Sequence, residues 1–308
     1  MLDIRRMRVL REVAAQGSFS AAAEALNFTQ SAVSQHVAAL ERESGTTLVD
    51  RGSRGVVLTD AGRALVGHAD AILARLECAE EDLADIAGLR GGRLRLACFQ
   101  SAGATLVPRA VAAFHERHPA VELSMVEAEP DEACARMKVG EIDLALVYDV
   151  EAIPGMLEAD LELTHLLDDP YDAILPAGHA LAERNRLRLA DLASEPWIAS
   201  TDAAGCRRIT ERACQDAGFS PRVAFEVDET LAAQALVAAG VGVTLLPRLA
   251  LTTVHPSVVA RRLAKAPVRR IWSARTRGEY QSPAGDAMLQ ILQDVAEDFR
   301  AGQLELAS

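Results

Sequence analysis

The sequence has few cysteines and no long hydrophobic run, and these absences exclude several classes of protein. Its five cysteines are odd in number, scattered and without the paired spacing of zinc ligands (Cys78, Cys98, Cys134, Cys206 and Cys214). This excludes a disulfide framework and indicates a reducing compartment. The nearest thing to a membrane span, 231–246, is interrupted by Gln234 and glycines, so we expect a buried helix and strand there. No secretion signal opens the chain, and we expect a cytoplasmic protein.

The sequence also lacks the usual signatures of catalysis and metal binding. Its seven histidines form no HExxH motif or other paired metal spacing, and no GxSxG motif is present. We therefore expect a protein without catalytic activity, resident metal or cofactor. An enzyme built on a two-lobed α/β domain remains an alternative. So does a solute-binding transport component, which would require a secretion signal.

Positive charge is scarce and unevenly distributed. The net charge is −12, but residues 1–58 carry seven basic and six acidic side chains, which gives +1 for this segment and leaves −13 for the rest. A near-neutral segment binds nucleic acid weakly, because affinity grows with the number of phosphates that are neutralised. If the first segment binds DNA, we expect two or more copies of the chain on one duplex.

Residues 18–43 show the pattern of a helix-turn-helix, with two short helices and a tight turn between them. Ser20 is expected to cap the first helix, over residues 21–26. Thr29 is expected to cap the second helix, which begins at Gln30.

The second of these helices has an apolar face and a polar face. Val33, Val37 and Leu40 recur at helical spacing and form one inward stripe. Short or amide-bearing side chains occupy the other face and its leading end, where they could bond to base edges and phosphates (Gln30, Ser31, Ser34 and Gln35). The pattern favours a recognition helix that enters a DNA groove. The alternative is an ordinary surface helix, because amphipathic helices are common.

A two-stranded wing is predicted after Gly45. Residues 46–49 and 56–58 are short β-prone runs on either side of a Gly/Ser/Arg tip. Arg51 and Arg54 lie on this tip, where a guanidinium could contact a phosphate or enter a minor groove.

With the wing included, the sequence resembles the LysR-type transcriptional regulators. The matching residues follow one another in order (Phe19, Ala22, Ala23, Leu26, Gln30-Ser31-Ala32-Val33-Ser34, Leu40-Glu41, Gly45, Leu48, Arg51, Arg54-Gly55-Val56, Leu58-Thr59 and Ala61-Gly62). Two positions depart from the family pattern: Val49 stands where Phe is usual, and Gln35 stands where many members have Arg.

The resemblance implies a bacterial regulator at the nucleoid that binds a dyad-symmetric DNA site as a homodimer or homotetramer, with RNA polymerase as a further partner. The residues expected to contact DNA are Ser20, Thr29, Gln30, Ser31, Ser34, Gln35, Arg51 and Arg54.

Residues 59–90 are predicted to form a long helix, since they contain no Pro and have Gly only near the two ends. Steps of four and three over about three heptads form the seam of a coiled coil. The seam residues are Leu65, Ala69, Ile72, Leu76, Ala79, Leu83 and Ile86. The resemblance implies an antiparallel dimerising linker. The alternative is a long helix packed on its own domain.

From Leu94 onward strand and helix patterns alternate, which predicts a parallel sheet. The chain is expected to leave a first lobe near 163–167 and to return near 263–268, the layout of periplasmic-binding-protein domains and of the LysR-type effector domain. The predicted fold class is α/β in three parts: a winged helix-turn-helix domain (1–58), a linker helix (59–90) and a two-lobed periplasmic-binding-protein-like effector domain (91–308; lobe I about 91–164 and 266–308, lobe II about 165–265).

A small-molecule effector is expected between the lobes, because open α/β sheets bind ligands past the carboxyl ends of strands and against helix N-termini. The resemblance places contacts at two turns, one in each lobe. The residues expected to line the site are Gln100, Ser101, Tyr148, Asp149, Ser200, Thr201 and Asp228. Each could instead be only a helix cap. Nearby acids, including Glu127 and Glu129, suggest a polar ligand with a cationic group, although acids at helix starts also complement the helix dipole.

Cys206 and Cys214 leave a redox-sensing regulator as an alternative. Some family members sense peroxide with two cysteines in this region, and Arg207 and Arg208 could favour a thiolate. Eight positions on a helix span roughly 12 Å, however, which is too far for a disulfide without local unfolding.

Overall fold

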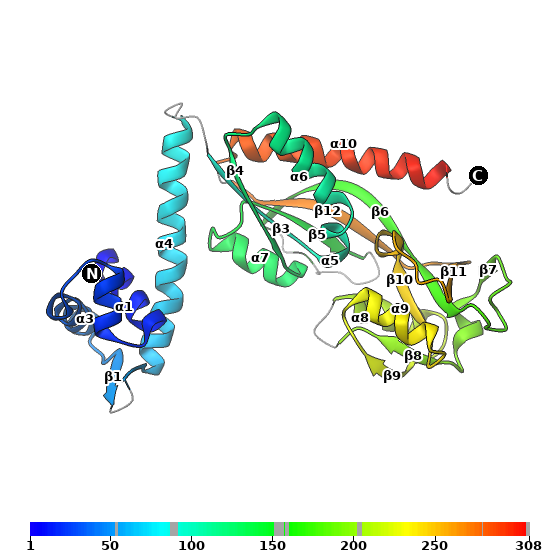
Figure 1. Ribbon diagram of the computed structural model, residues 1–308, viewed down its shortest axis with the longest axis horizontal. Coiled ribbons are helices and arrows are strands. Elements are labelled where there is room, and N and C mark those ends of the chain that lie inside the picture. The colour runs from blue at the N-terminus through cyan, green and yellow to red at the C-terminus, as the bar shows by residue number, and fades with distance from the viewer. Residues whose placement is uncertain are drawn as a thin grey trace. The chain divides into compact units, whose positions relative to one another are not determined.

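The computed structural model describes residues 1–52, 55–86, 92–150, 157, 160–201, 205–278 and 280–305; within these ranges the side chains of 51, 52, 55, 78, 81, 82, 84–86 and 303–305 are not described (Figure 1). The chain forms two compact units. The first comprises Met1–Gly88 with Val139–Glu141, and the second comprises Leu89–Lys138 with Ile142–Ser308. Within the described ranges, no helix is both long and apolar enough to cross a membrane.

The first unit consists of three short helices, a two-stranded antiparallel wing and one long helix. In chain order these are α1 (Ile4–Gln16), α2 (Phe19–Ala25), α3 (Gln30–Ser44), β1 (Val49–Gly52), β2 (Gly55–Leu58) and α4 (Asp60–Ile86). The apolar faces of the three short helices share one core with Leu48, Leu65 and Ala69. Gly62 lets α4 approach the wing closely, since a Cβ at this position would lie 2.0 Å from the carbonyl oxygen of Leu48.

Side-chain caps set the start of each short helix. Thr29 caps α3 as predicted, with its Oγ1 accepting a hydrogen bond from the Ala32 N–H at 3.2 Å. The prediction that Ser20 caps α2 was wrong. Ser18 is the cap, and Ser20 lies exposed inside the helix, because the helix starts early enough to bury Phe19 in the core.

The first wing strand also begins later than predicted. Residues 46–48 precede β1, and the backbone N–H groups of Leu48 and Val49 both donate to the Glu41 carboxylate on α3. These bonds tie the entry of the wing to the end of α3.

Helix α4 uses its apolar stripe in two ways. Leu65 and Ala69, the first two residues of the predicted seam, are buried in the core of the first unit. This part of the helix therefore packs on its own domain, as the alternative interpretation proposed. Ile72, Leu76 and Leu83 remain 39%, 42% and 67% exposed, so these three residues are not covered by any described part of the chain.

Lobe I of the second unit is a sheet with helices on both faces (Figure 1). Strands β3 (Arg93–Cys98), β4 (Glu122–Glu127) and β5 (Leu144–Asp149) are parallel, as the alternating pattern predicts, and β12 (Val268–Thr276) joins β5 in antiparallel sense. Helices α6 (Leu106–Arg117) and α10 (Pro283–Glu305) pack against each other over one face, whereas α7 (Pro130–Lys138) covers the other.

The chain passes between the lobes twice, once within strand β6 (Leu161–Pro176) and once between β11 (Val258–Leu263) and β12. Strand β6 pairs with β12 over 161–170 and then with β10 (Thr244–Pro247) and β11. The crossing predicted at 163–167 therefore lies within a continuous strand, and the one at 263–268 connects β11 to β12.

Lobe II completes the second unit. It adds β7 (Arg186–Leu187), η1 (Leu189–Leu192), β8 (Pro196–Ala199), α8 (Gly205–Asp216), β9 (Arg222–Glu226), α9 (Thr230–Ala238) and η2 (Arg248–Leu251). Strands β8 and β9 form a separate parallel pair. The apolar pattern of β11 is interrupted by Arg261 and Arg262, so the sequence did not predict this strand.

Candidate functional site

Helix α3 is fixed in the first unit by one apolar face. Val33, Val37 and Leu40 have no exposed surface. The turn before the helix is sharp, because Asn27 adopts a positive φ of 54° and the Phe28 N–H returns to the Ala23 carbonyl at 2.8 Å. Both features hold α3 at a defined orientation to α2.

The opposite face of α3 is polar and accessible. Gln30, Ser31 and Gln35 are exposed, Ser34 is half-buried, and the hydroxyls of Ser31 and Thr29 form a 3.0 Å hydrogen bond. A helix with these donors and acceptors can contact base edges and phosphates in a major groove. The predicted contacts of the Arg51 and Arg54 side chains lie outside the described residues.

A cavity of about 480 Å³ lies between the two lobes of the second unit. Residues predicted for effector binding line it at the turn after β3, at the turn after β8 and before α9: Gln100, Ser101, Ser200, Thr201 and Asp228. The Thr201 N–H and hydroxyl both donate to Asp228, at 2.8 and 2.9 Å. The Thr230 hydroxyl donates to Oε1 of Gln100 at 3.2 Å, and this bond links the two lobes.

The other two predicted effector residues do not line the cavity. Tyr148 is fully buried, and its hydroxyl donates to the Glu129 carboxylate at 2.6 Å. Asp149 accepts hydrogen bonds from Arg270 at 2.6 and 2.9 Å and from the Trp272 indole at 2.9 Å. Asp149 is held away from the cavity by β12, the antiparallel neighbour of β5, which supplies both of its partners.

Arg269, which lines the cavity, belongs to a buried ion pair. Arg269 of β12 and Asp169 of β6 are each 1% exposed, with the Arg269 Nη2 2.9 Å from the Asp169 carboxylate. The same nitrogen donates to the Ser101 Oγ at 2.6 Å, and the guanidinium carbon lies 4.8 Å from the centre of the Phe99 ring. Burial opposes the positive charge, but the field of Asp169 and its other neighbours outweighs this and raises the pKa of Arg269.

The cavity wall is otherwise acidic. Glu127, Glu129, Asp228 and Glu229 line it, and Arg269 is its single cation among the described residues. The residue Glu129 as a whole is exposed, but its carboxylate is partly desolvated, and this desolvation raises its pKa. The hydrogen bond from Tyr148 acts in the opposite direction and lowers the pKa.

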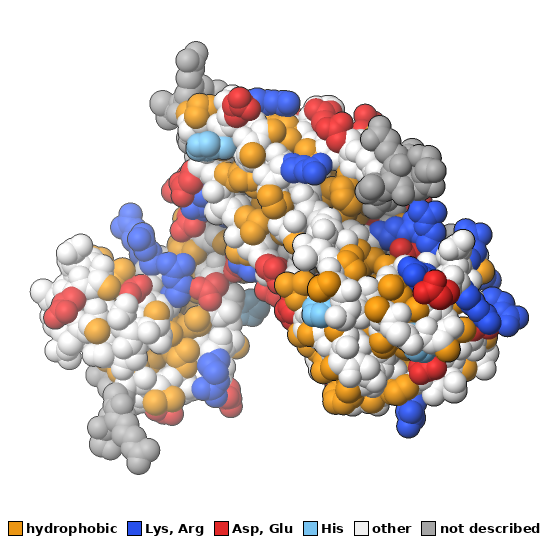
Figure 2. Space-filling view, turned by 45° about the vertical axis from the view of Figure 1, so that its right-hand side comes forward, with side chains coloured by type: hydrophobic (Ala, Val, Ile, Leu, Met, Phe, Trp, Pro, Cys, Tyr) orange, Lys and Arg blue, Asp and Glu red, His pale blue; other side chains and the backbone are white. Residues whose placement is uncertain are grey.

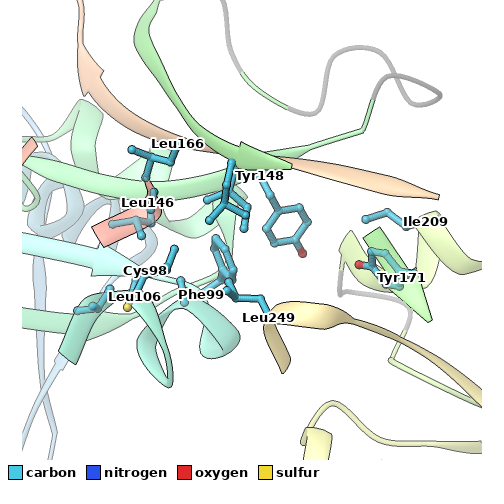
Figure 3. Packing of buried hydrophobic residues seen from close by; sticks show 14 of the residues in the cluster. Cys98, Phe99, Leu106, Leu146, Tyr148, Leu166, Tyr171, Ile209 and Leu249 are labelled. Atoms are coloured by element: carbon cyan, nitrogen blue, oxygen red, sulfur yellow. The ribbon is translucent and has the colours of Figure 1, made fainter. Parts of the chain in front are cut away.

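The two cysteines of the redox alternative have different surroundings. Cys206 lines the cavity, with its Sγ 3.6 Å from the Tyr148 hydroxyl and 3.5 Å from the Tyr171 hydroxyl. The hydroxyl ends of these tyrosines face each other in Figure 3. Cys214 is fully buried, and desolvation raises its pKa to about 12. Both lie on α8, so a disulfide between them would require the helix to unwind.

Sequence reasoning missed part of the cavity lining. Arg269, Thr210 and Thr244 line the cavity and are buried. The Arg269-Arg270 pair within the strand 268–276 was the one available signal. It does not reveal the partner, because Asp169 is a hundred positions away along the chain.

Comparisons with known proteins cover both units. The family model described as bacterial regulatory helix-turn-helix protein, lysR family, matches residues 4–63, and the LysR substrate binding domain matches residues 87–297. The probable HTH-type transcriptional regulator LrrA of Synechococcus elongatus is 31% identical over 301 residues, which cover 97% of this chain and 99% of that protein. YfeR of Shigella flexneri, an uncharacterized HTH-type transcriptional regulator, is 28% identical over 302 residues, which cover 98% of this chain and 96% of that protein.

The fold is shared with a solved regulator–DNA complex. Full-length CbnR bound to its target DNA matches with a TM-score of 0.71 and 22% identity, over 96% of this chain and 100% of that one. The family models match both the recognition-helix unit and the two-lobed unit, and the curated relatives are named as transcriptional regulators, not as enzymes. The chain belongs to the LysR family of DNA-binding transcriptional regulators with an effector-binding domain.

Proposed function

We propose that this regulator binds a dyad-symmetric DNA site as a homodimer or homotetramer, with α3 of each copy in a major groove. The observation that carries the proposal is the contrast between the fully buried stripe of α3 and its polar outer face. Gln30, Ser31, Ser34 and Gln35 contact bases and nearby phosphates, and Arg51 and Arg54 of the wing contact the backbone. A regulator of this kind acts at the nucleoid, in the cytoplasm.

We assign DNA binding to residues 1–58, dimerisation to 59–90 and effector binding to 91–308. Ile72, Leu76 and Leu83 form the dimer contact in this proposal, because they continue the α4 stripe beyond the part that is buried in the first unit. Two copies are needed, since residues 1–58 carry a net charge of only +1 and one copy would neutralise few phosphates.

The effector in this proposal is a polar small molecule that carries a cationic group. Four carboxylates line the cavity, and its one described cation, Arg269, is already paired with Asp169. A ligand cation would compensate this excess of negative charge, whereas an anion would add to it. The hydroxyls of Ser200 and Thr201 provide neutral hydrogen-bonding groups beside the acids.

Effector binding would change the relation between the lobes. The Gln100–Thr230 hydrogen bond joins the two lobes beside the cavity. A ligand that binds between the lobes and separates these residues would favour a different angle between the lobes. The altered geometry at the linker then changes DNA bending or the contact with RNA polymerase.

The DNA contacts are tested by footprinting at fixed salt with the variant Ser34→Ala/Gln35→Ala. Loss of two base-contacting groups should lower affinity at least about tenfold. Gln16→Ala, at the exposed end of α1, is the control and should bind as the unchanged protein does. An unchanged footprint and affinity for the double variant would contradict the assignment of α3.

The effector site is tested by thermal unfolding of the full chain in the presence of arginine or putrescine and, as controls, dicarboxylates of similar size. Cationic compounds should raise the midpoint, and Asp228→Asn should reduce the effect. Stabilisation by the dicarboxylates alone would reject the cationic class. If no compound stabilises the protein, and Ser101→Ala and Thr201→Val leave regulation intact, the cavity is not the effector site.

A further inference from the structure

A second cavity, of about 630 Å³, lies beside the connection between the lobes. Its walls come from Val150 just after β5, the start of η1, residues 209–217 of and after α8, and the segment 264–268 that leads from β11 into β12. Most of the lining is apolar, and Val150, Leu189 and Ile209 contribute buried side chains to it. This volume is in the range of sites that bind small organic molecules.

The mouth of the second cavity is cationic, although the chain as a whole carries −12. Among the described residues, Arg188, Arg212 and Lys265 line it, against one carboxylate, Asp216. Arg212 pairs with Asp216 at 3.1 Å, and Arg188 pairs with an aspartate outside the lining. Lys265 is exposed and has no salt-bridge partner in the described part of the chain. A ligand anion would supply the charge partner that Lys265 lacks.

The positive surface continues beyond the mouth. The parallel pairing of β7 with β11 sets Arg186 directly opposite Arg262, and both are exposed. Like charges in opposite positions of a sheet repel each other. Arg186 and Arg188 flank the buried Leu187, so they project to the same outer side. Figure 2 shows Lys and Arg side chains gathered at the right-hand edge of the view.

We propose that the second cavity binds an organic anion with an apolar body, whose acidic group lies at Lys265. Both halves of this ligand class follow from the lining: the apolar part covers Ile209 and Ala213, and the anionic part meets the cationic mouth. An organic cation would be repelled by the mouth, and a fully polar anion would leave the apolar walls in contact with water.

The second cavity shares helix α8 with the cavity between the lobes. Cys206 and Thr210 of α8 line the cavity between the lobes, whereas Ile209 and Ala213 line the second cavity. The ligand would thus contact the adjacent face of the same helix, next to the strands that cross between the lobes.

The test uses anilinonaphthalene sulfonate, a fluorescent organic anion, titrated into the full-length protein. The dye should bind, and octanoate should displace it while octylamine should not. Lys265→Glu should weaken binding at least about fivefold, and Ala213→Phe, which fills the cavity, should abolish it. Arg208→Glu is the matched control: it removes an exposed cation from α8 that does not line the cavity, and it should change affinity less than about twofold.

Far-UV circular dichroism and the thermal midpoint confirm that each variant is folded. Dye affinity that stays within about twofold in both folded variants, Lys265→Glu and Ala213→Phe, overturns the proposal. Loss of binding in Ala213→Phe alone, or equal displacement by octylamine, overturns the preference for anions. If Ala213→Phe does not fold, Lys265→Glu against Arg208→Glu decides the question.

Discussion

Removal of Arg269 provides a demanding test of the effector domain's internal electrostatics. In Arg269→Met, Asp169 stays buried, and of its two hydrogen-bonding partners only the Leu249 N–H remains, at 3.0 Å. Ser101 also loses its 2.6 Å bond to the guanidinium. A buried charge is thereby left without its counterion.

The expected loss of stability follows from this burial. Removing one partner of a buried ion pair costs about 3–5 kcal/mol, whereas replacing both with apolar residues is often close to neutral. Arg269→Met should therefore be destabilised by about that amount, and Arg269→Met/Asp169→Leu should recover most of it. Against a total stability of about 5–15 kcal/mol, the single change is large.

The dependence on pH has a defined sign. Desolvation already raises the pKa of Asp169, and loss of the Arg269 charge raises it further. An acid whose folded-state pKa exceeds its unfolded value is better tolerated when protonated, so its stability contribution is lost as pH rises. The deficit of Arg269→Met should shrink on acidification and grow toward neutral pH.

Denaturant unfolding of the full chain measures this cycle, with tryptophan fluorescence as the probe. Both tryptophans, Trp197 and Trp272, belong to the second unit, so the signal reports that unit separately from the DNA-binding unit. A single variant within about 1 kcal/mol of the unchanged protein, or a double variant as unstable as the single one, would refute the reasoning.

Three further predictions concern smaller features. Gly62→Ala should destabilise the first unit and weaken DNA binding, because the added Cβ would lie 2.0 Å from the Leu48 carbonyl oxygen. Circular dichroism melting and a DNA titration would measure these effects. An unchanged melting temperature would contradict the prediction. Thr29→Ala should cost about 1 kcal/mol by removing the α3 cap, whereas Ser20→Ala, inside α2, should be nearly neutral in the same melts. The raised pKa of Glu129 means that ionisation of its carboxyl group opposes folding. Glu129→Gln should therefore be at least as stable as the unchanged protein near neutral pH, and this difference in stability should vanish on acidification. A difference that stays constant across pH would argue against the prediction.

Local patterns were sufficient for the recognition helix. The spacing of Val33, Val37 and Leu40 marks a buried face, and Thr29 marks the cap, because both depend on contacts within a few residues of chain. The error at Ser20 has a local cause as well: two serines flank Phe19, and burial of Phe19 in the core decides which one is the cap.

The sequence by itself determined the family, the alternation of strands and helices, and the turns that carry Gln100, Ser101, Ser200 and Thr201 to the cavity. The tertiary structure decided which charges remain accessible. Antiparallel pairing with β12 withdraws Asp149 from the cavity and brings Arg269 to Asp169, and the β7–β11 pairing sets Arg186 against Arg262. These pairings join residues far apart in the chain, and strand register, which sequence periodicity leaves open, fixes which charge meets which.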